Sequence, residues 1–393
     1  MNKIKLGDAG YVFNGNSINA KVKKEKYCSG ESGLPYIATK DLTFKGEFDY
    51  ENGVKIPFSE LDNFKVAKHE SVLICAEGGS AGRKIGFLNT DVCFGNKLFA
   101  YEPTREFCGR YVYYYFLSSE FQKDFKSNLK GIIGGVSLKK FKELEIPQIP
   151  LTKQLAIVSK LDQAFEAIDQ AIANTEKSIQ LTEDYFESAL NKALQHPDRD
   201  TAEIYLNDAC EIKSKLIDPK DEKYKDWIHV GAANIVSQKG RLVNLKKVSE
   251  ENLISGKFTF TNQMVLYSKI RPYLRKIVMC DDKGLCSADI YPLTPKKGII
   301  LQSYLFFVLM SEDFTSYAIN GSQRAGMPKV NRNHLFKYKF KCPSIEEQKS
   351  ASSLLIGLLS TVEELQGSLI LKKQQLVELK MSILEKAFKG ELD

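Results

Sequence analysis

Two long stretches of the chain carry mostly apolar residues at alternating steps of three and four. The first runs from Val158 through positions 161, 165, 168, 172, 175 and 179, and the second from Leu355 through 358, 362, 365, 369, 372, 376, 379 and 383. This spacing is a heptad seam, which predicts a long helix packed against another helix. Pro150 and Pro343 precede the two stretches, and His196-Pro197 and Gly390 follow them, as expected at helix boundaries.

The remaining residues, 1–146 and 201–340, show a different pattern. Short apolar runs such as Ser71–Ala76 and Gln263–Ser268 are broken by Gly, Asn, Asp and Pro, which predicts strands and turns. Each region also holds one predicted helix, near Arg110–Phe125 and Leu301–Ala318. Tyr and Phe lie on most faces of these helices, so we interpret them as core elements rather than as platforms for stacked bases.

The chain repeats itself with an offset near 194 residues. Ser188–Leu194 resembles Ser382–Phe388, and Gln154 after Pro150 corresponds to Gln348 after Pro343. Other matches follow in the same order, with offsets between 192 and 200: Leu6 with Leu206, Arg83-Lys84-Ile85 with Arg275-Lys276-Ile277, Cys93 with Cys286, and Ser119-Glu120 with Ser311-Glu312. So many ordered matches predict a tandem duplication.

The predicted fold class is therefore α+β, with two tandem mixed α/β domains separated by two long helices. The expected boundaries are a first domain at 1–150, a helix at 151–197, a second domain at 198–343 and a helix at 344–393. Some 40 residues of helix make a rod about 60 Å long, which needs a partner along its length. We expect the two rods to form an antiparallel coiled coil with an approximate two-fold axis, so that one chain imitates a symmetric dimer.

The distribution of charge suggests what the domains bind. Residues 201–343 contain 23 basic and 14 acidic side chains, and residues 1–150 contain 22 and 18, whereas both predicted rods are acidic. Basic domains favour a polyanion such as nucleic acid. Two basic domains held at a fixed separation would match two half-sites on a duplex, and their divergence predicts an asymmetric site. The charge argues against the alternative from another class, a coiled-coil scaffold that never touches DNA.

Patterns that suggest catalysis are weak. Pro197-Asp198 with Glu211-Ile-Lys213 fits the loose outline of a nuclease, but the first copy has Tyr11 and Phe13 at the equivalent positions. Gly78–Lys84 lacks the spacing of a phosphate-binding loop. The eight cysteines never form a Cys-x-x-Cys pair, so we expect isolated thiols and no metal site. The N-terminus has no apolar signal region, so we expect a cytoplasmic protein without a membrane partner.

The beginnings of both predicted rods resemble a known family. Ile146–Gln154, followed by Ile157-Val158 and Lys160-Leu161-Asp162, is similar to a signature of the specificity subunits of type I restriction–modification systems. Lys341–Gln348 is similar to the same element, with departures at Ser344 and, in the first copy, at Thr152-Lys153. Three shorter segments also resemble family elements: Gly134–Leu138, Gly326–Asn331 and Gly78–Ile85. The resemblance covers the whole chain in the order domain, helix, domain, helix.

This resemblance implies a non-catalytic subunit that reads a bipartite, asymmetric DNA sequence. Each domain would be a target-recognition domain, and the helices would set the gap between the half-sites. The helices would also bind two methyltransferase subunits, and restriction subunits with motor and nuclease activity would complete the enzyme. This chain would hold no cofactor, because S-adenosylmethionine, ATP and Mg²⁺ belong to the partner subunits. A specificity-like subunit of another phage-defence methylation system is the closest alternative.

DNA bases are read mainly by Arg, Lys, Asn and Gln, and phosphates are bound by Lys, Arg and backbone amides. Residues that recur in both copies, Arg83 with Arg275 and Lys84 with Lys276, are predicted to bind phosphate. Gln323, Arg324 and Arg271 lie where the copies differ and are predicted to read bases. The candidates in the first domain are Lys40, Arg83, Lys84, Asn96, Lys97, Lys130 and Lys139. Those in the second are Asn234, Lys269, Arg271, Arg275, Lys276, Gln323, Arg324, Lys329, Asn331 and Arg332.

Overall fold

The computed structural model describes residues 2–28, 32–130, 134–195, 201–322 and 328–392. Its contacts divide the chain into two compact units. Unit 1 consists of Met1–Asn174 and Lys372–Asp393, and unit 2 is Thr175–Leu371. Each unit therefore combines one mixed α/β domain with parts of both long helices.

The long helices are α6, Leu151–Leu194, and α11, Ile345–Lys389. Ser344, the residue that departs from the family signature, caps the start of α11. Its hydroxyl accepts a hydrogen bond from Glu347 N (3.4 Å), and the Glu347 carboxylate accepts one from Ser344 N (3.1 Å), which is a reciprocal capping box. At the other end, Gly390 follows α11 with φ of +78°, the left-handed conformation in which glycine commonly ends a helix.

The two helices run antiparallel within each unit, as predicted. In unit 1 the beginning of α6 lies against the end of α11: Leu161 shares a core with Leu384, and Lys380 Nζ binds Asp169 Oδ1 at 2.6 Å. In unit 2 the end of α6 lies against the beginning of α11, where Leu190 and Leu355 share a core. Leu161 and Leu355 are related by the 194-residue offset, and both are completely buried.

The predicted seam is correct along α6 and at the start of α11 but wrong further along α11. Val158, Leu161, Phe165 and Ile168 are all buried, as expected. In α11, however, the predicted seam residue Leu365 is 46% exposed, and the next residue, Gln366, is buried instead. A straight α-helix has 3.6 residues per turn, so a strict 3.5-residue seam drifts by about 20° per heptad and eventually changes register.

The domain of unit 1 contains two four-stranded sheets and a small two-stranded one. The first sheet is antiparallel in the order β2-β9-β6-β7, and the second is mixed in the order β4-β3-β8-β5 with β3 and β8 parallel. Strands β1 and β10 pair next to the start of α6. The strands are β1 Lys3–Lys5, β2 Gly10–Asn14, β3 Gly33–Ile37, β4 Lys55–Pro57, β5 Val66–Ala67, β6 Val72–Cys75, β7 Ile85–Phe87, β8 Val92–Phe94, β9 Leu98–Pro103 and β10 Glu145–Pro147.

The domain of unit 2 repeats this plan with one additional strand. Its sheets have the orders β12-β20-β17-β18 and β13-β16-β19-β14-β15, and β14 and β19 are parallel. Strands β11 and β21 form the small pair. The strands are β11 Glu203–Tyr205, β12 Cys210–Glu211, β13 Leu216–Ile217, β14 Ile228–Val230, β15 Lys246–Lys247, β16 Lys257–Phe260, β17 Val265–Ser268, β18 Ile277–Met279, β19 Gly284–Ser287, β20 Ile290–Pro295 and β21 Lys339–Lys341.

In each domain the predicted aromatic helix is in fact two helices. α3 (Gly109–Leu117) ends at Ser118, which caps α4 (Ser119–Ser127) by accepting a hydrogen bond from Phe121 N. In the second domain, Ser311 separates α8 (Gln302–Met310) from α9 (Glu312–Asn320) in the same way. Serine favours this cap because its side chain satisfies a backbone N–H at a helix start. The apolar pattern alone did not reveal the break.

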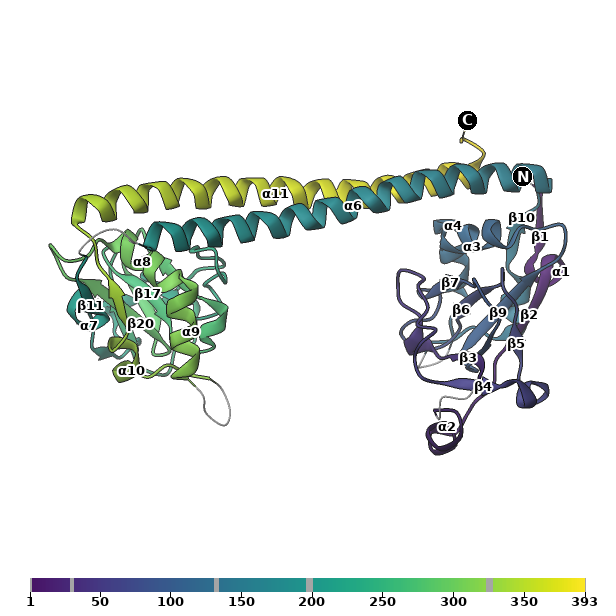
Figure 1. Ribbon diagram of the computed structural model, residues 1–393, viewed down its shortest axis with the longest axis horizontal. Coiled ribbons are helices and arrows are strands. Elements are labelled where there is room, and N and C mark those ends of the chain that lie inside the picture. The colour runs from purple at the N-terminus through teal and green to yellow at the C-terminus, as the bar shows by residue number, and fades with distance from the viewer. Residues whose placement is uncertain (1, 29–31, 131–133, 196–200, 323–327, 393) are drawn as a thin grey trace. The chain divides into compact units, whose positions relative to one another are not determined.

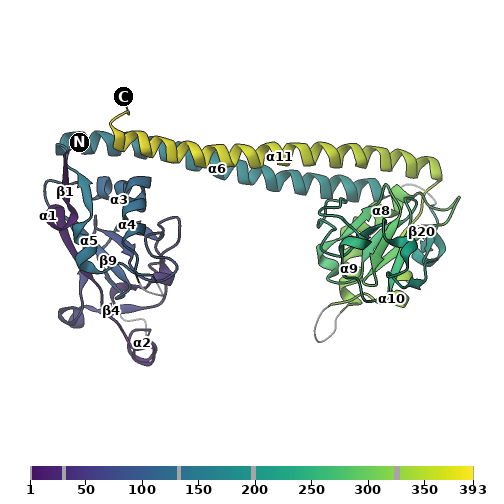
Figure 2. The same cartoon turned by 180° about the vertical axis from the view of Figure 1, so that it is seen from behind.

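The first helix of each pair, α3 or α8, lies between the sheets and the long helices of its own unit (Figures 1 and 2). The expectation that their aromatic residues form core is confirmed: Tyr111, Tyr115 and Phe116 are almost fully buried. The short helices are α1 Leu6–Ala9, α2 Ala20–Lys26, α5 Leu138–Glu143, α7 Leu206–Ala209 and α10 Arg332–Phe336. The result is a stack in which each domain is fixed to its helices by a continuous aromatic and aliphatic core.

Candidate nucleic-acid interface

Four loops of unit 1 meet at one edge of its domain. The hairpin loop between β6 and β7 lies at the centre, and hydrogen bonds join it to the others. These bonds run from Ala76 N to Lys97 O (2.9 Å), from Gly78 N to Gly134 O (2.8 Å) and from Lys84 Nζ to Thr39 O (2.8 Å). We call this surface the first loop edge: residues 38–46, 76–84, 95–97, 128–130 and 134–137.

The first loop edge brings together six of the seven residues assigned to DNA contact in the first domain. Five of them are exposed: Lys40, Arg83, Asn96, Lys97 and Lys130. Lys84 is different, because its ammonium group donates to Thr39 O and joins two loops of the protein itself. Lys139 is exposed on α5 and lies outside the four loops.

Sequence analysis missed one aromatic residue at this edge. The Phe44 ring is 58% exposed, and the Arg83 guanidinium lies 4.8 Å from its centroid. The cation–π contact and a hydrogen bond from Arg83 Nη1 to Gly79 O (3.3 Å) orient the guanidinium, which stays exposed. An isolated Phe in a polar loop gives little signal in the sequence, because single exposed apolar residues are common on protein surfaces.

Unit 2 contains an equivalent surface, the second loop edge: residues 231–244, 269–276, 287–289 and 328–331. Its loops are joined by bonds that match those of unit 1, from Lys269 N to Asp289 O (3.0 Å), from Arg271 N to Pro328 O (2.9 Å) and from Lys276 Nζ to Ala232 O (2.5 Å). The scaffold of the loop edge is therefore duplicated together with the domain.

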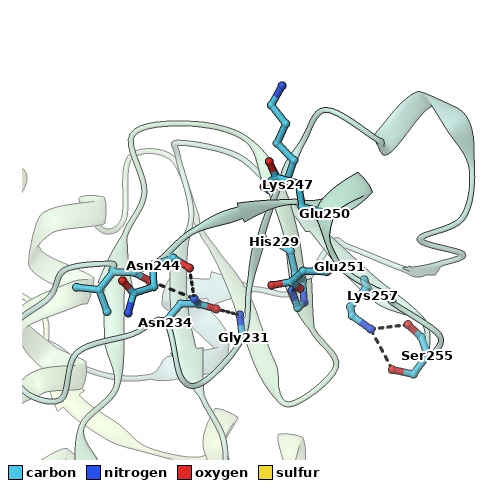
Figure 3. Close-up of polar contacts among 10 residues, drawn as sticks. His229, Gly231, Asn234, Asn244, Lys247, Glu250, Glu251, Ser255 and Lys257 are labelled. Atoms are coloured by element: carbon cyan, nitrogen blue, oxygen red, sulfur yellow. Dashed lines mark hydrogen bonds and ion pairs between the residues drawn. The ribbon is translucent and has the colours of Figure 1, made fainter.

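Several residues assigned to DNA contact instead hold this scaffold together. Asn234 closes its own loop, because its side chain accepts from Gly231 N (2.8 Å) and donates to the carbonyls of Val243 and Asn244 (Figure 3). Lys269 is mostly buried and donates to Ala288 O. Lys84 and Lys276 recur in both copies because both join the same pair of loops. This internal role is a structural reason for their repetition, and phosphate binding by either lysine stays a prediction.

Arg275 also occupies a different position from the one expected. Its guanidinium, with the side chain only 12% exposed, pairs with Glu187 on α6. Its counterpart Arg83 is exposed and lies against Phe44. The shared sequence Arg-Lys-Ile therefore does not give the two arginines a shared role.

Four other candidates in the second domain lie at or beside the second loop edge with part of their polar surface available. Arg271 is exposed, and Lys329 pairs with Asp289 at 3.1 Å. Asn331 caps α10 by accepting from His334 N (2.8 Å). Arg332 is exposed, and its guanidinium lies 5.6 Å from the Phe336 ring. Gln323 and Arg324 lie outside the described residues.

A second aromatic residue that sequence analysis missed, Tyr273, is displayed on the second loop edge. It is 50% exposed, and its neighbours Pro272 and Leu274 are packed inward. The flanking Arg271 and Arg275 have φ of +50° and +44°. Left-handed backbone is unfavourable for arginine and persists only where surrounding contacts fix it, often at functional sites. The tyrosine is therefore held outward on a constrained loop.

Close to this edge, His229 on β14 forms a buried pair with Glu251. His229 Nδ1 and Glu251 Oε2 are 2.5 Å apart and lie side by side in Figure 3. The other ring nitrogen, Nε2, is buried and has no hydrogen-bond partner among the described residues. Burial lowers the pKa of His229 below its ordinary value, although Glu251 acts in the opposite direction.

This arrangement predicts that unit 2 loses stability in mild acid. The unfolded chain takes up a proton at the ordinary histidine pKa, about 6.5, whereas folded His229 resists protonation. The contribution of neutral His229 to the stability of unit 2 is therefore fully present above that pH. It is lost as the pH falls toward the lower pKa of the folded state. We expect urea unfolding midpoints at pH 7.5 and 5.5 to differ less in His229→Gln than in the wild type. An equal difference in both proteins would contradict this role for His229.

One buried glutamine in each unit secures the start of the long helix. Gln154 accepts from Cys108 N (2.8 Å) and donates to Glu106 O and Ile149 O. Gln348 accepts from Leu301 N (2.8 Å) and donates to Ile299 O and Pro343 O. Both side chains are fully buried, and each of these three bonds in one unit has a counterpart in the other. The matching glutamines in the sequence thus form one structural motif used twice.

The described residues give little support for catalysis. They include no group of three or more His, Cys, Asp or Glu side chains that could hold a metal ion. Of the nuclease-like outline, Glu211 pairs with Lys213 at 3.0 Å, and Asp198 lies outside the described residues. By length and composition alone, α11 is the one described helix that could cross a membrane, with a mean hydropathy of 1.5 over 18 residues.

Comparisons with known proteins agree on the family. The family model for the type I restriction modification DNA specificity domain matches residues 1–181 and 199–370. The type I restriction enzyme EcoDI specificity subunit of Escherichia coli is 31% identical over 202 residues, which cover 51% of this chain and 44% of that protein. The chain thus matches a little under half the length of this relative.

Two solved structures have a similar fold. A chain from a study of complex assembly and conformational transition of the type I R-M system has a TM-score of 0.76 with 14% identity, over 100% of this chain and 98% of the other. The HsdS subunit from Thermoanaerobacter tengcongensis has a TM-score of 0.58 with 16% identity, over 100% and 97%. At these identities the likeness concerns the fold alone.

Proposed function

Because the chain belongs to the type I restriction–modification DNA specificity family, we propose that its two loop edges read the two halves of a bipartite DNA site. The duplicated loop edge is the observation that supports this most directly. The hydrogen-bonded scaffold is the same in both domains, but the exposed side chains differ. The first edge presents Arg83 over Phe44, whereas the second presents Arg271 and Tyr273. Two half-sites of different sequence fit this arrangement.

We propose that the partners are double-stranded DNA, two methyltransferase subunits and the restriction subunits. The chain is a non-catalytic subunit, so S-adenosylmethionine, ATP and Mg²⁺ would act on the partner subunits, in the cytoplasm. Exposed apolar side chains along α11, including Leu354 and Leu365, offer a surface for a protein partner. The domain boundaries proposed from sequence separate these roles. The domains at 1–150 and 198–343 would read DNA, and the helices at 151–197 and 344–393 would bind the partner subunits.

Methylome sequencing of the host with and without the gene would test the proposed function. A specificity subunit should place adenine methylation at one bipartite motif that disappears when the gene is deleted. If deletion of the gene removes no methylated motif, the result would contradict DNA recognition and favour the coiled-coil scaffold. Loss of a motif in a host that lacks restriction subunits would instead favour a specificity-like subunit of another methylation system.

Arg271→Ala is expected to weaken discrimination at one base position of the site by about 1–3 kcal/mol. The side chain is exposed on a loop that is constrained by the bond from its own amide to Pro328 O. Competition binding with single-base variants of the site would measure the effect in the assembled complex. Lys297→Ala, which removes an exposed charge outside the loop edge, is the matched control. Equal weakening on cognate and random duplexes would exclude base reading by Arg271.

A further inference from the structure

Two basic side chains reach from the second loop edge to the long helices of unit 2. Arg275, in the hairpin loop, pairs with Glu187 on α6. Lys239, in the neighbouring loop, donates to Gln366 Oε1 on α11 at 2.6 Å. The loop edge that is proposed to meet DNA is thus bonded directly to both helices, in addition to the apolar core beneath it.

These two contacts form one connected network. Gln238 N donates to Arg275 O (3.2 Å), so the two loops that carry the basic side chains are joined to each other. On the helix side, Gln366 Nε2 donates to Thr182 Oγ1 at 2.9 Å, which joins α11 to α6. Movement of the loop edge over the helices would therefore break several bonds together.

The Arg275–Glu187 pair is largely removed from water. Glu187 Oε2 is buried and has no hydrogen-bond partner among the described residues. Burial raises the pKa of Glu187, and Arg275 opposes this effect by stabilising the carboxylate. A buried ion pair adds little net stability, because desolvation offsets the attraction, but separating the partners is strongly unfavourable. Such a pair therefore restricts geometry more than it stabilises the fold.

No equivalent contact is found among the residues of unit 1 that the structure describes. Arg83, the counterpart of Arg275, is exposed, and the position 194 residues after Glu187 is Met381, which cannot form an ion pair. The ion pair between domain and helix in unit 1 is Arg110–Asp162 (2.7 Å), where Arg110 belongs to α3 rather than to a loop. Within the part of the chain that the structure describes, only unit 2 ties an arginine of its loop edge to a long helix in this way.

We infer that Arg275 and Glu187 are positioning residues that fix the orientation of the second loop edge on α6 and thereby restrict the spacing between half-sites that the protein accepts. This inference rests on the proposed function. Each base pair added between half-sites moves one of them by about 3.4 Å and rotates it by about 35°. A domain that can change its orientation relative to α6 could still contact the displaced half-site. A domain whose orientation is fixed by the ion pair cannot.

The test compares duplexes whose two half-sites are separated by the natural spacing or by one base pair more or less. Binding is measured with the complete methyltransferase complex, after methylome sequencing has given the site. We expect the wild type to bind both altered duplexes at least about tenfold more weakly, a difference of about 1.4 kcal/mol. In Glu187→Met/Arg275→Met, which replaces the pair by apolar side chains of similar size, this difference should fall below about threefold.

Two further variants separate positioning from folding and from DNA contact. Glu187→Arg/Arg275→Glu restores an ion pair of reversed polarity and should restore the strict spacing. Lys239→Met removes the second contact without disturbing the buried pair, and it should also relax the spacing. It therefore provides a second test if the methionine double variant fails to fold. Arg83→Met, the counterpart in unit 1, should weaken all three duplexes equally.

Strict spacing that survives both Glu187→Met/Arg275→Met and Lys239→Met would overturn the inference. If these variants weaken binding to all three duplexes equally, the inference would be overturned as well. The residues would then contribute to affinity without restricting the spacing. A wild-type complex that methylates no bipartite site would overturn the proposed function itself, which is a separate result.

Discussion

Replacing Gln348 with Leu should lower the free energy of unfolding of unit 2 by about 3–5 kcal/mol. Leucine is close to glutamine in size, so the change removes hydrogen bonds without opening a large cavity. It leaves Leu301 N, Ile299 O and Pro343 O without the partner that they have now, in a fully buried site. Each unsatisfied buried group costs about 1–3 kcal/mol, with some relief from relaxation.

The single tryptophan of the chain makes this effect measurable in one unit. Trp227 lies in unit 2 and packs against Tyr224, with the ring centroids 5.0 Å apart. Its fluorescence during urea unfolding therefore reports on that unit alone. We expect Gln348→Leu to shift the fluorescence transition to much lower urea.

Two matched substitutions complete the experiment. Gln263→Leu makes the same chemical change at an exposed position of unit 2 and should leave the transition in place. Gln154→Leu breaks the equivalent motif in unit 1, so it should shift the circular dichroism transition more than the tryptophan transition. A tryptophan transition that Gln348→Leu shifts no more than Gln263→Leu does would show that the buried bonds contribute little.

The sequence was most informative where a pattern occurs twice. The long helices, their antiparallel pairing and the duplicated domains follow from the heptad seams and the 194-residue offset, because burial of one helix face requires a regular spacing. The repeated Gln154 and Gln348 were visible as a match, but their function was not. Two of the three partners of each glutamine come from a loop that precedes it by about 50 residues, and local patterns do not encode such contacts.

Repetition alone does not identify which basic residues bind DNA. Lys84 and Lys276 recur, and this suggested a shared contact with phosphate, but both bind a backbone carbonyl of a neighbouring loop. In a duplicated protein, scaffold residues repeat because both copies need the same fold. Residues that read different half-sites must diverge, so the side chains that differ at matching positions, such as Arg271 and Tyr273, are better candidates for base contact.

The heptad pattern also did not predict that the buried face of α11 changes register along the helix. Hydrophobicity favoured Leu365, yet Gln366 turns inward and bonds to Thr182 and Lys239. A buried polar residue with satisfied hydrogen bonds can fix the register of a helix pair. The consequence is that Leu365 joins the exposed face of α11, where it lies on the same side as Leu354, eleven residues earlier.

The double substitution Leu354→Gln/Leu365→Gln should weaken binding of the methyltransferase subunits by about 30-fold to 1,000-fold. This corresponds to the loss of about 2–4 kcal/mol when two anchor residues of an interface are removed. The two side chains are 63% and 46% exposed in this chain, so they add little to its own core. Substitutions at such exposed positions usually change stability by no more than about 0.5 kcal/mol.

A protein partner explains this apolar face better than a membrane does. α11 carries adjacent carboxylates at Glu363 and Glu364 between the two leucines, and each acidic residue near the centre of a membrane helix costs about 2.5–3.5 kcal/mol. At a protein interface the exposed carboxylate of Glu364 can stay at the polar rim. The helix face is thus suited to a partner that covers leucines and leaves charges hydrated.

The effect is best measured by co-purification and by titration of tagged methyltransferase subunit against the two forms of this chain. Leu216→Gln/Ile254→Gln is the matched control, because it removes two exposed aliphatic residues of the second domain that are not on the long helices. We expect only the helix variant to lose the partner, and we expect it to be more soluble than the wild type when purified alone. Tight binding by the helix variant, or equal loss in both variants, would place the methyltransferase subunits elsewhere on the chain.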